Sequence, residues 1–200
     1  MKKKKRVSKT YLFLRRIGLN YPEEEYGEVS FSTVIKRICK TYRDAFLLNL
    51  FMDSWLLSPL EPHIIRPWVL RKIGCHVGKG VFIGSKVWID SGHADLIYIE
   101  DHAHVTGLTV LLCHKRDLSG YRRGYDYAKL PYKTGEIHLG KGCSTGTGTL
   151  VMPGVTIGEG AIVGAGSLVT KDIPAWTIAV GRPARVLKVI KEKTDECFDI

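Results

Sequence analysis

Residues 139–174 read LGKGCS, TGTGTL, VMPGVT, IGEGAI, VGAGSL, VTKDIP when written in groups of six, and this stretch decides the fold. The first place of the groups is aliphatic in all but one, and glycine dominates the second and fourth places. A period of six matches neither the 3.6-residue period of a helix nor the two-residue period of a plain strand. It is typical of a short strand and a tight turn, repeated until the chain winds back over itself and stacked repeats share one apolar column. The sequence therefore predicts an all-β solenoid.

The stretch GVTIGEGAIVGAGSLVTKDIPAWTIAVGRPARVLKVI, residues 154–190, resembles the C-terminal half of the hexapeptide-repeat acyltransferases. That family includes galactoside, nodulation-factor, streptogramin and exopolysaccharide O-acetyltransferases. The resemblance covers roughly residues 73–190. It implies a left-handed parallel β-helix of triangular section, with three hexapeptides per coil, assembled as a homotrimer. The left hand runs against the usual right-handed crossover, so it rests on the resemblance alone.

The hexapeptide rhythm also sets the predicted domain organisation. Residues 73–190 form the β-helix, residues 1–72 a basic tail and a helical segment, and residues 191–200 a short C-terminal extension. The rhythm is absent from residues 114–134. Because so long an irregular segment is unusual inside a tight repeat, the sequence predicts a functional loop there.

The early repeats are interrupted once. Their first places are, in order, Val77, Ile83, Ile89, Ile99, Val105 and Leu111. A slip of four residues separates Ile89 from Ile99, as is common where one corner of a solenoid bulges. The repeats therefore continue in register on both sides of the slip.

The N-terminal third carries weaker signals. Residues 1–30 are expected to have little fixed structure, because proline and glycine interrupt them. A helix is expected from Ser30, which with Ser32 is a candidate N-cap, and its continuation through Leu47–Leu57 is left open. A second short helix over Trp68–Lys72 is expected to lead into the solenoid.

Composition indicates one ordinary globular domain with a smaller appendage. The chain has 200 residues, of which 44% are hydrophobic, and the absence of an apolar run of about 18 residues excludes a spanning helix. The apolar stretch at 11–14 is too short for a secretory signal, and Arg15 and Arg16 follow it, so export is not expected. The five cysteines are scattered, odd in number and without a CxxC pattern. Reduced thiols in a cytoplasmic protein are the plain interpretation.

The positive charge is concentrated at one end. Eight of the thirty basic residues lie in residues 1–16 with no acidic residue among them, which leaves 22 basic against 20 acidic residues elsewhere. No basic groove-reading element appears, so nucleic acid is not an expected partner. The tail is either a solvated segment or a contact for an anionic membrane surface. The apolar stretch Phe46–Leu70 likewise either packs as core or docks, through Trp55 and Trp68, at a membrane interface.

His114 opens the irregular loop, and in the resembled family a histidine at the mouth of this loop is the catalytic base. Such a base takes a proton from an alcohol near pH 7 and returns one to the leaving thiolate. The resemblance thus implies direct transfer of an acetyl group from acetyl-CoA, with no covalent enzyme intermediate. Cys113 is then an inert core thiol. Asp117 is a candidate to orient His114 or to bind the acceptor, and a solvated loop carboxylate is the alternative.

A metal site is the rival interpretation of the histidines. A γ-type carbonic anhydrase uses the same fold with three histidines on zinc. Here His102 and His104 alternate on one strand, while His93 and His138 lie elsewhere. This spacing does not match that ligand pattern, and we expect no metal.

The resemblance also implies a site for the coenzyme A arm, against backbone groups between neighbouring subunits. The positions that match the family's cofactor contacts are Thr147, Ala165, Thr170, Lys171 and Arg185. Small residues let the arm approach the backbone, and the cations could meet its phosphates. Relatives often carry Trp-Ile-Gly where this chain has Ser-Thr-Gly at 144–146, so an aromatic neighbour of the arm is missing.

Together these features predict an acetyl-CoA-dependent O-acetyltransferase that acts on a sugar of a surface polysaccharide or its lipid-linked precursor. Candidate acceptor-binding residues in the loop are Asp117, Tyr121, Arg122 and Arg123. The expected location is cytoplasmic, with a peripheral contact at the inner face of the membrane as an option. The alternatives are an acetyltransferase for a small free acceptor, such as an antibiotic or a simple sugar, and a non-catalytic trimeric scaffold.

Overall fold

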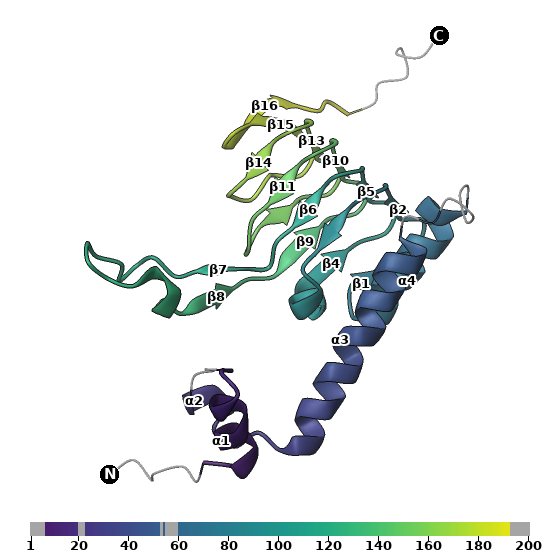
Figure 1. Ribbon diagram of the computed structural model, residues 1–200. Coiled ribbons are helices and arrows are strands. Elements are labelled where there is room, and N and C mark those ends of the chain that lie inside the picture. Colours follow the sequence, from purple (N-terminus) through teal and green to yellow (C-terminus); the bar gives the residue numbers. More distant parts are fainter. Residues whose placement is uncertain (1–6, 20–22, 53, 55–59, 193–200) are drawn as a thin grey trace. The chain divides into compact units, whose positions relative to one another are not determined.

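The structure is a computed structural model, and it describes residues 7–19, 23–52, 54 and 60–192. The described residues fall into two compact units, residues 1–46 and 47–200. The larger unit holds the hexapeptides, an arm that projects from them and a short helix at their base (Figure 1).

The hexapeptides form three parallel sheets. Sheet 1 contains β1 (His76–Val77), β4 (Ile97–Ile99), β9 (Ile137–Leu139) and β12 (Thr156–Ile157). Sheet 2 contains β2 (Phe82–Ile83), β5 (His104–Val105), β10 (Ser144–Thr145), β13 (Ile162–Val163) and β15 (Thr177–Gly181). Sheet 3 contains β3 (Trp88–Ile89), β6 (Val110–Leu111), β11 (Leu150–Val151) and β14 (Leu168–Val169). From β1 to β6 and from β9 to β14, successive strands visit sheets 1, 2 and 3 in turn, so each of these turns of the chain adds one strand to every sheet. The structure thus confirms parallel sheets preceded by helices, whereas the left hand of the coil stays a prediction.

The first place of each repeat points into the coil. Ile83, Val105, Thr145 and Val163 stand in register along sheet 2 and are all fully buried. The buried Thr145 hydroxyl lies 3.2 Å from the Thr109 hydroxyl, so the one polar first place has a partner inside the core. The apolar column that the sequence predicts is therefore the core of the larger unit.

Glycine at the second and fourth places has two separate causes. A Cβ on Gly146 would lie 2.3 Å from the backbone nitrogen of Ala165, so adjacent turns of the coil stack too closely for a side chain there. Gly142, at a fourth place, has φ of +64°, a left-handed conformation that glycine adopts without strain. The glycine pattern is thus a requirement of the coil's geometry.

Residues 114–134 form a two-stranded arm, more regular than the loop that the sequence predicts. Strand β7 (His114–Arg116) pairs antiparallel with β8 (Tyr132–Thr134), and a 3-10 turn, η3 (Tyr127–Lys129), lies between them. The arm projects from the coil (Figure 1). Strand β16 (Ala184–Val189) also runs antiparallel, against β15 at the last edge of sheet 2.

Helices precede the coil. The expectation of little fixed structure over residues 1–30 was wrong for α1 (Lys9–Arg16) and α2 (Glu23–Tyr26). Helix α3 (Phe31–Phe51) begins as predicted, and the Ser30 hydroxyl accepts the Thr33 N–H at 3.2 Å. The helix ends at Phe51, so it covers only the first part of the continuation through Leu47–Leu57 that was left open. No helix among the described residues is long and apolar enough to cross a membrane.

Helix α4 (Arg66–Ile73) closes the base of the coil. It follows a π-helical turn, η1 (Glu61–Ile65), and begins two residues before the predicted helix. Its Val69, Leu70 and Ile73 are fully buried in the same cluster as the coil core. The apolar stretch before the repeats is therefore packed, at least over this helix, whereas Trp55 lies outside the described residues. The predicted boundary at residues 72 and 73 stays a prediction.

The apolar positions of α3 behave differently from expectation. A stripe on this helix is exposed rather than core-facing, namely Phe31, Ile35, Ile38, Tyr42 and Phe46, whereas Asp44 is buried. Periodicity alone predicts an apolar face and does not identify what covers it.

Candidate active site

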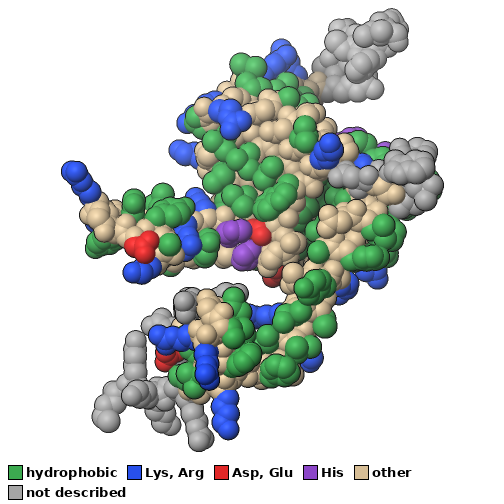
Figure 2. All heavy atoms as spheres, viewed as in Figure 1, with side chains coloured by type: hydrophobic (Ala, Val, Ile, Leu, Met, Phe, Trp, Pro, Cys, Tyr) green, Lys and Arg blue, Asp and Glu red, His purple; other side chains and the backbone are tan. Residues whose placement is uncertain are grey.

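His114 lies where the arm leaves the coil. Strand β6 ends at Leu111, two residues form the corner between sheets 3 and 1, and His114 begins β7. Figure 2 shows imidazole groups on the surface at the root of the arm, with an acidic group beside them. The side chain of His114 is 31% exposed, so one edge of the imidazole can meet a substrate.

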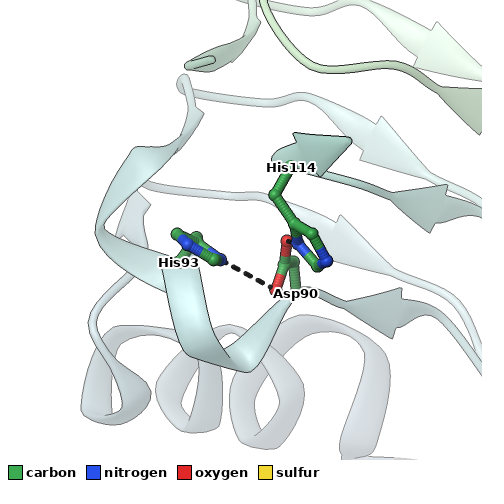
Figure 3. Close-up of side chains that lie close together, drawn as sticks. All are labelled: Asp90, His93 and His114. Carbon is green, nitrogen blue, oxygen red and sulfur yellow. Dashed lines mark hydrogen bonds and ion pairs between the residues drawn. The ribbon is translucent and has the colours of Figure 1, made fainter. Parts of the chain in front are cut away.

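Asp90 is the partner of His114. In sheet 3 Ile89 pairs with Leu111, so Asp90 occupies the same corner one turn earlier. Its Oδ2 accepts the Cys113 backbone N–H at 3.2 Å and contacts Nδ1 of His114 (Figure 3). Because Asp90 is only 4% exposed, its carboxylate has little water around it and depends on these donors.

His93 completes the cluster. It lies on the short 3-10 segment η2 (Ser91–Leu96), in a non-helical kink, and its Nδ1 is 3.3 Å from Oδ1 of Asp90. The His93 and His114 rings are 5.0 Å apart. The two imidazoles therefore flank one carboxylate, each on its own oxygen (Figure 3).

This arrangement fixes what His114 can do. A carboxylate accepts only, so Nδ1 of His114 carries the proton in this contact and Nε2 keeps its lone pair. An imidazole held this way can take a proton at Nε2, and the nearby carboxylate then stabilises the imidazolium. The pair has the chemistry of a general base, His114, with a carboxylate that orients it, Asp90.

Cys113 is an inert thiol, as the sequence predicts. It is fully buried, and burial together with the Asp90 charge raises the pKa of its thiol to about 12. The neutral thiol is a poor nucleophile. Its backbone N–H, which Asp90 accepts, is the part of this residue that the site uses.

The root of the arm is stiffened by stacked groups. The His114 ring meets the edge of Tyr132 with centroids 5.3 Å apart, and the Arg116 guanidinium lies 3.9 Å from the centre of the same Tyr132 ring. Arg116 also donates to the backbone oxygen of Leu130 across the arm. Such cation–π and hydrogen-bond contacts hold β7 and β8 in one orientation next to His114.

The predicted acceptor residues lie further out on the arm. Oδ1 of Asp117 accepts the Ser119 N–H at 3.0 Å, and this bond lowers the pKa of the Asp117 carboxyl. Asp117 therefore stabilises a turn, whereas the carboxylate that contacts Nδ1 of His114 is that of Asp90. Tyr121, Arg122 and Arg123 are exposed in the connection between the strands, where Arg122 donates to the Tyr121 backbone oxygen at 2.9 Å.

The five predicted cofactor residues fall on two edges of sheet 3. Thr147 and Ala165 stack at the corner between sheets 2 and 3, where the Gly166 N–H donates to the Thr147 oxygen at 2.8 Å. Arg185, on β16, pairs with Val180 near this corner. The other two, Thr170 and Lys171, follow β14 at the corner between sheets 3 and 1, the same corner as His114 two turns earlier.

Sequence reasoning missed Asp90 and His93. The signal for Asp90 was present, because Ile89 and Leu111 are both first places and the count of repeats sets them side by side. His93 has no such signal, since it lies before the slip in a turn, η2, whose kinked path the repeat does not define.

Comparison with known proteins supports the repeat assignment directly. A family model described as bacterial transferase hexapeptide (six repeats) matches residues 136–171. The repeats of this chain are therefore similar to those of the bacterial hexapeptide transferases. This hexapeptide-repeat chain is 30% identical to the galactoside O-acetyltransferase of Escherichia coli over 131 residues, 63% of this chain and 62% of that one. It spans about half the length of its Staphylococcus aureus relatives, which carry acetyltransferase names, at 37% identity over 115 residues.

Two solved structures of hexapeptide proteins share the fold. A maltose O-acetyltransferase of Clostridium difficile superposes with a TM-score of 0.60 at 24% identity, covering 78% of this chain and 88% of its own. A hexapeptide-repeat acetyltransferase of Vibrio cholerae, solved with acetyl coenzyme A, gives 0.61 at 22% identity, covering 86% of this chain and all of its own. At these identities the likeness is one of fold.

Proposed function

We propose that this protein is an acetyl-CoA-dependent O-acetyltransferase that acts on a sugar. The observation that carries the proposal is the Asp90–His114 pair, held at a corner of a hexapeptide coil with Nε2 of the histidine free to act. The galactoside O-acetyltransferase relative supports the reaction class, and the Vibrio cholerae structure supports acetyl-CoA as the second substrate.

The reaction is a direct transfer. Nε2 of His114 takes the proton of the acceptor hydroxyl as its oxygen attacks the thioester carbon of acetyl-CoA. A backbone N–H of an adjacent turn stabilises the resulting oxyanion. The intermediate collapses, the carbon–sulfur bond breaks, and the imidazolium returns its proton to the thiolate of coenzyme A. Asp90 holds the imidazole and stabilises its charged form, while Cys113 takes no part.

The cofactor site is proposed along sheet 3. Thr147 and Ala165 are small and exposed at one edge, where a pantetheine arm can approach the backbone. Lys171, exposed at the edge that also carries His114, and Arg185 offer cations for the phosphates. Thr170 lies beside Lys171. Because residue 144 is a serine and not an aromatic residue, only backbone groups contact the pantetheine arm on that side.

The acceptor is proposed to be a sugar of a surface polysaccharide or its lipid-linked precursor. The half-buried Asp117 and the exposed Tyr121, Arg122 and Arg123 on the β7–β8 arm supply the hydrogen-bonding and aromatic groups that bind sugars. A small free acceptor remains the alternative within the same chemistry. The buried carboxylate of Asp90 orients His114, and a scaffold without activity would have no need of this contact, so that alternative is disfavoured.

The assembly is proposed as a homotrimer of left-handed coils. The outward side of sheet 3 supports a packed face, because Trp88, Val110, Leu150 and Leu168 stand in register along it. Apolar side chains gather over β6, β11 and β14 in Figure 2. A cytoplasmic location with a peripheral membrane contact completes the proposal, supported by the four free cysteines among the described residues and by the basic N-terminus.

Thiol release from acetyl-CoA, measured over a panel of nucleotide sugars, lipid-linked sugars and simple sugars, tests the function. The wild type should release thiol with at least one acceptor, and His114→Ala should lower turnover by about 10²–10⁴-fold. His102→Asn is the matched control, because His102 has φ of +59° and asparagine tolerates that conformation. A His114→Ala variant that keeps more than about a third of the rate would show that His114 is not the base.

A further inference from the structure

The cluster around Asp90 offers more than a base and its orienting acid. We propose that Asp90, His93 and His114 form a binding site for a divalent transition-metal ion such as Zn²⁺, and that the bound ion switches off acetyl transfer. The binding site stands on the geometry alone, and the inhibition rests on the proposed function.

The three ligand atoms lie near enough to one another to converge on one ion. Each residue offers one atom, and all three atoms lie within 4.8 Å of one another. Zinc lies about 2.0–2.2 Å from nitrogen and oxygen ligands, which separates neighbouring tetrahedral ligands by roughly 3.3–3.5 Å. Oδ1 of Asp90 and Nδ1 of His93 are 3.3 Å apart. Modest rotations of the His93 and His114 side chains therefore bring the separation between their two Nδ1 atoms into this range.

The cluster is also reachable and supported from behind. The side chains of His93 and His114 are 37% and 31% exposed, whereas that of Asp90 is 6% exposed. An ion can thus arrive from solvent on the imidazole side and keep water in its remaining position. The Cys113 N–H bound to Asp90 is the kind of outer contact that orients a carboxylate ligand.

The ligand set selects the class of ion. Two imidazole nitrogens and one carboxylate oxygen suit Zn²⁺, Co²⁺, Ni²⁺ and Cu²⁺, whereas Mg²⁺ and Ca²⁺ prefer oxygen ligands. Three protein ligands leave a fourth tetrahedral position for water. The proposed occupant is therefore a borderline-soft ion, and Mg²⁺ serves as a negative control.

Metal binding and base catalysis exclude each other at His114. In the catalytic state Nδ1 carries a proton toward Asp90, and Nε2 holds the lone pair. An ion takes the Nδ1 lone pair, so the proton of the neutral ring moves to Nε2, and no basic nitrogen remains for the acceptor hydroxyl. The ion also occupies the Asp90 carboxylate that would stabilise the imidazolium. Occupancy thus removes both functions at once.

Cobalt spectroscopy tests the site without any substrate. Co²⁺ added to the full-length, metal-free protein should give visible absorption bands of low-symmetry coordination that saturate at one ion per chain and vanish on adding Zn²⁺. His93→Gln should weaken Co²⁺ binding by at least about tenfold. His138→Gln, at an exposed histidine that pairs with Glu136 instead, should leave binding unchanged. Absence of the bands, or equal bands in His93→Gln, overturns the site whether or not the protein transfers acetyl groups.

Inhibition is tested on metal-free enzyme with a responsive acceptor. Zn²⁺ should stop thiol release and a chelator should restore it, whereas Mg²⁺ should do neither. His93→Gln, compared with its own metal-free rate, should require at least about tenfold more Zn²⁺. Cobalt binding without inhibition, or the same Zn²⁺ sensitivity in His93→Gln, overturns the inhibitory role. A protein that binds Co²⁺ but transfers nothing when metal-free would instead count against the proposed function.

Discussion

At the scale of single residues, the site depends on one buried carboxylate. Asp90 divides its two oxygens between His114 and His93 and takes a backbone N–H as well. A buried carboxylate that loses its donors is costly, so these contacts hold the proposed base in place. The identity of residue 90 therefore affects both the tautomer and the position of His114.

Asp90→Asn tests that dependence. An asparagine can still accept the Cys113 N–H, but it carries no negative charge beside Nδ1 of His114 and so no longer stabilises the imidazolium that forms during proton transfer. Turnover should fall by about 10²–10⁴-fold while the KM for acetyl-CoA changes little. Steady-state kinetics measure both values, and a turnover near that of the wild type would remove Asp90 from the mechanism.

The proposed phosphate contacts of the cations at the edges of sheet 3 are also tested by steady-state kinetics. Lys171→Ala or Arg185→Ala should raise the KM for acetyl-CoA and leave the KM for the acceptor near its original value. Phosphate contacts hold the cofactor equally in the ground and transition states, so turnover should persist. Lys141→Ala, at an exposed lysine between sheets 1 and 2, is the control. An equal rise in KM for both substrates would contradict the assignment.

At the scale of elements, the repeats and the position of the slip between them were predictable, whereas the local path of the chain before the slip was not. The six-residue count identifies first places from Val77 to Val169, and each of them pairs with a first place in an adjacent turn. This follows because the same six-residue period that spaces the first places also stacks the turns. The count also places Asp90 beside the residues before His114. The kink at His93 depends on the local path of η2, and the arm's strands depend on cross-strand contacts, neither of which has a period.

The stacking of turns gives a direct stability test at Gly146. A Cβ there would meet Ala165 backbone at 2.3 Å, so Gly146→Ala should destabilise the coil by about 1–3 kcal/mol. For a chain of this length that is a fall in Tm of roughly 2–12 °C. Gly120→Ala, where a Cβ meets nothing within 4 Å, is the control. Equal melting temperatures for both variants would refute the close-stacking argument.

At the scale of the whole molecule, an apolar face and a projecting arm favour association with further copies of the chain. Trp88 is 48% exposed on the outward side of sheet 3, at the start of its row of apolar residues. Burying such a face against a second copy is favourable by about 25 cal/mol per Å² of apolar surface. We therefore expect light scattering to give a trimer, and Trp88→Lys to dissociate it. A monomer that is fully active at nanomolar concentration would contradict this expectation.

The two ends of the coil bear on how the protein avoids fibre growth. Stacked parallel strands end in rows of unpaired backbone groups, to which another copy could add. Helix α4 covers the first turn with Val69, Leu70 and Ile73. At the other end β16 reverses direction against β15, which places the exposed Arg185 and Lys188 along the last edge of sheet 2. A helix at one end and a reversed, charged strand on sheet 2 at the other therefore disfavour end-to-end addition of a second copy.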